Sequence, residues 1–228
     1  MRAIHALAGA LLVLTAPAEP RPRAEMQRLV IARLQYDGGG DWYGNPSSIP
    51  NLLKAINERT SLKVETSEAR VTLTDDRLWD LPFLHMTGHG EIKLSDVEVE
   101  RLREYLLRGG FLHVSDNYGL DTAFRREIAK VFPDRPLVDV PLGHPVYHIV
   151  YDFPKGLPKI HEHDGKPPRG FGIYIGDRLA LFYDHESDLG NGWEDPGTYN
   201  DPPELHEAAL RMGVNLFVYA VTSRPPTV

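Results

Sequence analysis

The strongest constraint on the fold is a regular alternation of strand-like and helix-like segments between residues 28 and 133. Short apolar runs alternate with stretches whose apolar residues recur every three or four positions. Because parallel neighbouring strands need a long crossover, this order predicts a mostly parallel sheet with helices on its faces. Strands are expected at residues 28–36, 62–65, 81–86 and 111–115, and helices are expected to begin near Ser48, Ser95 and Asp121.

The helix after Ser95 has the clearest boundaries. Ser95 and Glu98 have the spacing of a capping box, in which each side chain accepts a hydrogen bond from the backbone amide of the other residue. The two glycines at 109–110 mark its end. Similar capping is expected from Ser48 and from Asp121.

The second half of the chain departs from this alternation. Residues 171–175 and 179–183 are strand-like and flank Gly176 and Asp177, a two-residue hairpin turn. We expect this antiparallel hairpin to extend one edge of the sheet, followed by a last helix over residues 203–219. The expected fold class is therefore α/β, a three-layer sandwich with a mostly parallel sheet.

The N-terminus has the pattern of an export signal. Arg2 gives a short positive start, residues 6–16 form an apolar run too short to span a bilayer, and small residues at 16–18 suit cleavage. A membrane anchor or an unstructured tail is the alternative. The expected organisation is a signal peptide at 1–18, a spacer at 19–25, one α/β domain at 26–223 and a tail at 224–228, with the mature chain periplasmic or extracellular and without a transmembrane span.

Charge and composition argue against two classes of function. The 228-residue chain has 25 Lys and Arg against 32 Asp and Glu, a net charge of -7 without a basic block, so no nucleic-acid partner is expected. There is no cysteine, which excludes disulfides and every mechanism with a thiolate nucleophile.

Polar and glycine-rich segments follow several expected strands. In open α/β sheets ligands bind outside the carboxyl ends of the strands, so these segments are expected to converge on one rim. Asp116 is the first candidate, because a carboxylate at a strand end can bind a cation, orient a histidine or accept a proton. The candidate ligand-binding residues are Gly39, Asp41, Trp42, Gly88, His89, Gly90, Asp116, Asn117, Tyr118, His144 and His185, of which Asp116, His89 and His144 are also the catalytic candidates.

Each candidate also has a plainer interpretation. The glycines at 38–40 lack the lysine of a phosphate-binding loop and suit a turn. His89 can be a hydrogen-bonded loop residue, and Asp116 can satisfy backbone amides in a turn. The histidines and the acids at 184–188 have no metal-site spacing, so no metal is predicted and the cofactor stays open. Residues 161–164, between prolines and glycines, are expected to form an exposed loop.

Several motifs in order resemble one known family. They are PFLHMTGHG, SDVEVERLREYLLRGGFL, SDNYG, FRREIAKVFPD, HPVYH and GVNLFVYA. Together they resemble the bacterial domain of unknown function 4159 family over residues 26–221. The resemblance implies a fold similar to class I glutamine amidotransferases, of the flavodoxin-like kind. It also implies a role near the cell envelope, because some relatives carry the domain behind a membrane-anchored segment, but it supplies no established activity.

The turn after the fourth strand departs from both groups. Members of the family tend to carry two adjacent acids there, whereas this chain has Asp116 and Asn117, which weakens a paired-carboxylate metal site. Amidotransferases place a cysteine at the corresponding turn, and this chain reads VSDNY at 114–118. Thiol-dependent glutaminase chemistry is therefore excluded, and Ser115 as a replacement nucleophile would need a positioned base.

Two function hypotheses follow. The first is a non-catalytic, exported binding or assembly module whose rim recognises a small polar ligand, a glycan or an envelope protein. The second is a hydrolase in which Asp116, with His89, His144 or His185, binds a metal or acts as acid and base. In both, residues 88–90, residues 116–119 and His144 are expected to line one pocket. The aromatic residues suited to stacking on a ligand are Trp42, Tyr43, Tyr118 and Trp193.

Overall fold

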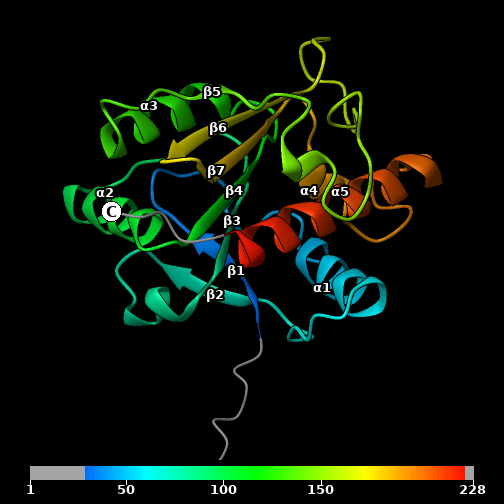
Figure 1. Ribbon diagram of the computed structural model, residues 1–228. Helices are drawn as coiled ribbons and strands as arrows, with labels where there is room; N and C mark the ends of the chain where they lie inside the picture. Colours follow the sequence, from blue (N-terminus) through cyan, green and yellow to red (C-terminus); the bar gives the residue numbers. More distant parts are fainter. Residues whose placement is uncertain (1–28, 224–228) are drawn as a thin grey trace, which may run out of the picture.

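One seven-stranded sheet lies between two layers of helices in a computed structural model that describes residues 29–223 (Figure 1). The strand order across the sheet is β2-β1-β3-β4-β7-β6-β5. The first four strands and the seventh are parallel, and the sixth runs antiparallel to both of its neighbours. In chain order the strands are β1 (Ile31–Gln35), β2 (Ala69–Thr72), β3 (Phe83–Met86), β4 (Phe111–Ser115), β5 (Val138–Asp139), β6 (Arg169–Ile175) and β7 (Arg178–His185).

The helices divide between the two faces of the sheet. In Figure 1 α2 and α3 lie on one side of the sheet, and α1 and α5 pack together on the other. The helices are α1 (Ser48–Arg59), α2 (Asp96–Leu107), α3 (Asp121–Val131), α4 (Leu189–Gly192) and α5 (Pro203–Thr222), with short 3-10 turns η1 (Asp76–Asp80) and η2 (Pro145–Tyr147).

Two apolar layers hold these elements together, one on each face of the sheet. Because successive side chains of a strand point to opposite faces, Phe83 and Phe111 belong to the layer beneath α1 and α5. Leu84 and Leu112 belong to the layer beneath α2 and α3. All four are fully buried, so the two central strands anchor both layers.

The expected fold class is confirmed, including the antiparallel part of the sheet. The hairpin of β6 and β7 forms as expected, and Gly176 takes the left-handed conformation that its turn requires, with a φ of 59°. β7 also pairs in parallel with β4, which places it inside the sheet. The short β5 pairs with β6 and forms the edge.

The prediction of a strand at residues 62–65 is wrong. There only Val64 pairs, in an isolated bridge with Leu29, and the second strand is β2. Val71 is the only buried residue of β2. An edge strand with one buried side chain carries too little apolar pattern for periodicity to identify it.

Helix capping follows the sequence in one case and tertiary contacts in another. The Ser95 and Glu98 capping box forms, with Glu98 Oε2 accepting from the Ser95 amide at 2.8 Å. At α1, in contrast, Ser48 is the first helical residue and no side chain of the preceding turn caps the helix. Glu194, far along the chain, accepts from the amides of Ser47 and Ser48 instead.

The third expected cap is also wrong, because Asp121 is the first residue of α3 and Leu120 occupies the cap position. The Asp121 carboxylate accepts hydrogen bonds from Arg125 and from Tyr183 of β7. The signal peptide, the spacer and the C-terminal tail expected from the sequence lie outside the described residues. Between residues 29 and 223, none of the helices has the length and apolar character needed to cross a bilayer.

Replacing Ser95 with alanine should destabilise the fold by about 1 kcal/mol, because the amide of Glu98 loses its acceptor at the start of α2. Urea unfolding followed by circular dichroism measures the change. Ser67→Ala is the matched control, since Ser67 is exposed and its side chain makes no hydrogen bond to the described residues. Equal stability of the two variants would contradict a stabilising cap.

Candidate functional site

The loops that follow β1 and β3 lie against each other at the carboxyl ends of the parallel strands. The Tyr36 hydroxyl donates to the Thr87 carbonyl at 2.9 Å, and the Gly40 amide donates to the Glu91 carbonyl. A Cβ at position 88 would lie 2.2 Å from the Tyr36 hydroxyl oxygen, and Gly88 has a φ of 142°. Only glycine therefore fits at this contact.

His89 and Asp41, both expected at the rim, form an ion pair. The His89 Nδ1 atom lies 3.0 Å from Asp41 Oδ2, and the His89 amide also donates to this carboxylate. Partial burial alone would raise the pKa of Asp41, but these hydrogen bonds outweigh it and lower the pKa. The His89 side chain is 55 % exposed, so the imidazole is available to a ligand.

The other candidates of the first loop have separate environments. Trp42 is half-buried and packs against the apolar layer beneath α2 and α3. Its ring meets the ring of Tyr43 edge-on, with 5.5 Å between centroids. Gly39 is exposed, with a φ of 96°. Tyr43 thus presents its ring to solvent beside a fixed tryptophan.

Asp116 lies inside the protein and not at its surface. Its residue is 3 % exposed, its backbone amide donates to Asp184 Oδ1 at 2.8 Å, and its Oδ2 accepts from the Glu186 amide at 2.9 Å. The carboxylate therefore ties the end of β4 to the end of β7. Asp116 satisfies backbone amides, as one of the two interpretations from the sequence predicts.

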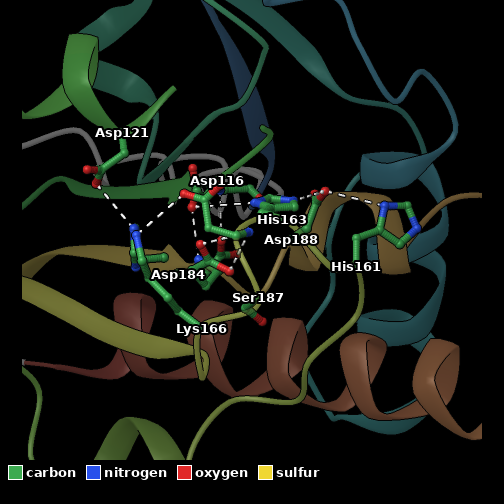
Figure 2. Close-up of polar contacts among 12 residues, drawn as sticks. Asp116, Asp121, His161, His163, Lys166, Asp184, Ser187 and Asp188 are labelled. Carbon is green, nitrogen blue, oxygen red and sulfur yellow. Dashed lines mark hydrogen bonds and ion pairs between the residues drawn. The ribbon is translucent and has the colours of Figure 1, made fainter. Parts of the chain in front are cut away.

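A histidine that the sequence placed in an exposed loop completes this cluster. Figure 2 shows His163 between Asp116 and Asp188; its Nδ1 lies 3.8 Å from Asp116 Oδ2 and its Nε2 lies 3.3 Å from Asp188 Oδ2. The side chain is only 7 % exposed. Burial disfavours the imidazolium, but the two carboxylates raise the pKa of His163 to about 10. Burial raises the pKa of Asp188, and His163 opposes that rise.

The expectation of an exposed loop at residues 161–164 is therefore wrong for His163. Glu162 and Asp164 are exposed, whereas His161 and His163 face the carboxylates. Residues two apart share one side of an extended segment. The spacing of the two histidines is the sequence signal that could have identified this pair.

A lysine and a histidine of the segment before β6 contact the acids of the loop after β7. Lys159 Nζ lies 2.7 Å from Glu186 Oε2. His161 Nδ1 lies 3.6 Å from Asp188 Oδ2 (Figure 2). Glu186 and Asp188 both adopt left-handed conformations, with φ of 61° and 62°. This conformation is uncommon outside glycine, and both residues are buried with side chains in polar contacts.

Three fully buried polar side chains, those of His85, His113 and Asp184, form a hydrogen-bonded row next to the cluster. His85 Nδ1 lies 3.0 Å from His113 Nδ1, and His113 Nε2 lies 3.1 Å from Asp184 Oδ2. Trp193 covers both imidazoles, with ring centroids 5.2 Å away. Burial lowers the pKa of His85 and raises that of Asp184 to about 6, although the His113 hydrogen bond opposes the latter shift. Neither histidine was a candidate from the sequence, because both lie within apolar strands.

Of the two other histidines expected in the site, His185 stays at the carboxyl end of β7 as its last residue, and His144 does not reach the rim. His185 Nε2 is 3.6 Å from Asp121 Oδ1, at the start of α3. The His144 ring packs against Tyr219, whose hydroxyl accepts from the Leu179 amide near the beginning of β7. This is the opposite end of the strands from residues 116–119, so the expectation that His144 lines a pocket with those residues is wrong. His144 lies there because, after the very short β5, the chain turns back toward the amino end of β7.

Two buried polar side chains at the ends of β3 and β4 have no partner among the described residues. Both amide atoms of Asn117 and the Oγ1 of Thr87 are unsatisfied. Asn117 is 1 % exposed and Thr87 is fully buried. The two loops are neighbours, since a Cβ at Gly119 would lie 3.9 Å from the Gly90 amide. Beside them, Tyr118 is 60 % exposed.

Among residues 29–223 no group of three or more His, Asp and Glu side chains is arranged to hold a metal ion. In the cluster of Asp116, His163 and Asp188, the positive charge between the carboxylates comes from the histidine itself.

Replacing His163 with glutamine should lower the free energy of unfolding by roughly 1.5–3 kcal/mol near neutral pH, because Asp188 loses a charged hydrogen-bond partner and Asp116 loses the nearby positive charge. The folded-state pKa, about 10, lies above the usual 6.5. The stabilisation is therefore complete below about pH 6.5 and is lost as the pH rises through about 10. Urea unfolding at a series of pH values measures the difference from the native chain.

His206→Gln is the control, since the His206 side chain makes no hydrogen bond or ion pair to the residues that the structure describes. A stability difference for His163→Gln that stays constant across this pH range would argue against the charged histidine.

Comparison with known proteins places the chain in a family. No curated protein matches it. A family model described as a domain of unknown function (DUF4159) matches residues 30–221, which is nearly all of the described α/β sandwich. The chain therefore belongs to the DUF4159 family.

Proposed function

We propose that this protein is a non-catalytic ligand-binding domain whose rim, at the ends of β3 and β4, binds a small hydroxyl-rich ligand of the glycan class. The observation that carries the proposal is the unpartnered state of Asn117 and Thr87. Buried polar groups are nearly always hydrogen-bonded, and exceptions in a native structure call for a missing water, ion or ligand. The two side chains together offer a carbonyl acceptor, an amide donor and a hydroxyl.

The surroundings of these groups suit a sugar. Tyr118 and Tyr43 are 60 % and 63 % exposed, and an exposed aromatic ring can stack on the apolar face of a sugar ring. The half-exposed His89, fixed by Asp41, adds a further polar contact. Hydroxyl groups of a sugar can act as both donors and acceptors, which matches the mixed character of Asn117 and Thr87.

The same geometry favours binding over hydrolysis. The hydrolase alternative needs Asp116 with His89, His144 or His185. His89 instead pairs with Asp41, His144 lies near the amino end of β7, and His185 contacts Asp121. Asp116 is buried and accepts from a backbone amide. Its histidine neighbour, His163, is held as a cation and so cannot act as a base near neutral pH.

We further propose an exported location and a role at the cell envelope, supported by the apolar run at residues 6–16 and its short positive start. A fold relationship with class I glutamine amidotransferases is part of the same proposal, supported by the order of the sequence motifs and the three-layer sandwich. Such a relationship carries no chemistry to this chain, which has no cysteine.

Asn117→Leu and Thr87→Val should each weaken ligand binding about tenfold or more, which corresponds to about 1.4 kcal/mol. Their free energies of unfolding should stay unchanged or rise, because an apolar side chain of similar shape removes an unsatisfied buried polar group. Saturation-transfer NMR with glucose, galactose and N-acetylglucosamine oligosaccharides as probes measures binding, and urea unfolding measures stability.

Thr66→Val, in an exposed loop, is the matched control for Thr87→Val. Binding that survives both substitutions, or the absence of binding to any probe by the native chain, would refute the proposed glycan site. Destabilisation by more than about 1 kcal/mol without a change in binding would assign the two side chains a structural role.

A further inference from the structure

A separate cavity of about 100 Å³ lies beside the beginning of α5. We propose that it binds a primary alkylammonium group, from a free amine or from a lysine side chain of a partner. This site uses different residues from the glycan site and goes beyond the proposed function. The side chains that carry the argument are those of Asn191, Glu194, Asp195, Tyr199 and Asp201.

The cavity is lined by three carboxylates, each with one oxygen already in use. Glu194 Oε1 accepts from two amides at the start of α1, Asp195 Oδ1 accepts from Asn51 at 2.9 Å, and Asp201 Oδ1 lies 3.2 Å from His161 Nε2. The second oxygen of each carboxylate has no hydrogen-bond partner within residues 29–223. The wall of the cavity therefore has carboxylate oxygens free to accept hydrogen bonds, and it carries excess negative charge.

Asn191 supplies an independent observation. This residue is 5 % exposed and lines the cavity. Its Nδ2 donates to Asp188 Oδ2 at 2.6 Å and meets His161 Nδ1 at 2.8 Å, while its Oδ1 is buried without a partner in the described part of the chain. A buried acceptor calls for a donor, and we place that donor in the cavity that Asn191 lines.

The chemistry of the wall selects the kind of ligand. Carboxylates repel an anion, and the described residues provide no set of three or more ligands arranged around a metal ion. An ammonium group offers three donors and a positive charge. At roughly 30 Å³ per water molecule, the cavity has room for about three waters, the size of a small alkylammonium head.

The remaining wall suits the apolar stem of such a ligand. Pro196 and Pro203 line the cavity, and the Tyr199 hydroxyl is committed to Asn45 Oδ1 at 2.7 Å, which fixes the ring. Burial raises the pKa of Tyr199, and the nearby carboxylates, Glu194 first among them, raise it further. Aromatic rings attract cations, so the ring adds to the pull of the carboxylates.

NMR titration of the full chain tests the proposal with four probes: n-butylamine, Nα-acetyl-lysine methylamide, n-butanol and calcium chloride. Both amines should shift the resonances of Tyr199 and His206, whereas butanol, which has the same stem without the charge, should not. Tighter binding of the lysine derivative would identify a partner's side chain as the source, and tighter binding of butylamine a free amine.

Asp201→Asn should weaken amine binding at least fivefold, because the substitution keeps the shape and removes a charge. Asp134→Asn, at a carboxylate that is 76 % exposed on the protein surface, is the matched control and should bind as the native chain does. Tyr199→Leu, at a residue that is 41 % exposed, is a second variant that should also weaken binding, and it serves if Asp201→Asn fails to fold.

Absence of amine binding, equal binding of butanol, or displacement of the amine by stoichiometric calcium would overturn the proposal. So would full amine affinity in folded Asp201→Asn or in Tyr199→Leu. A failure of the glycan probes leaves this result unaffected, because the two sites share none of the substituted residues.

Discussion

The buried carboxylate of Asp184 is the contact on which the rim depends. It joins the end of β7 to the imidazole of His113 on one side and to the Asp116 amide on the other. A carboxylate with no exposure to water persists only when hydrogen bonds compensate its lost hydration. Asp184 therefore fixes the relative position of β4 and β7 at the point where their loops begin. The ion pairs of the rim join residues of those loops.

The loops beside this contact are joined by a network of charged and polar side chains. Lys159, His161 and His163 come from one segment and meet three acids that follow β4 and β7. Breaking a buried pair by removing one partner is costly, whereas the net gain of the intact pair over apolar packing is small. Such a network fixes geometry without contributing much stability. This suits a rim where the Asn117 amide and the Asn191 Oδ1 atom have no hydrogen-bond partner among the described residues.

The two proposed sites differ in the charge that they present. The rim near Asn117 combines a buried amide, a buried hydroxyl and exposed tyrosines, which is a mixed polar environment. The cavity beside α5 has spare carboxylate oxygens and an unpartnered amide oxygen. A neutral hydroxylated molecule suits the first site, and an organic cation suits the second. One ligand that carries both groups could reach the two sites only if its own length matched their separation.

Local sequence determined the elements whose stabilising partners are close along the chain. The capping box at Ser95 and the hairpin turn at Gly176 depend on neighbours a few positions away, and both form as expected. The alternation of strands and helices also determined the α/β class, because parallel pairing demands crossovers. Only the tertiary structure decided that Glu194 caps α1, that His163 is buried and that His144 leaves the rim. Those outcomes depend on contacts between residues many positions apart, and the free energy of such contacts exists only once the sheet has brought the segments together.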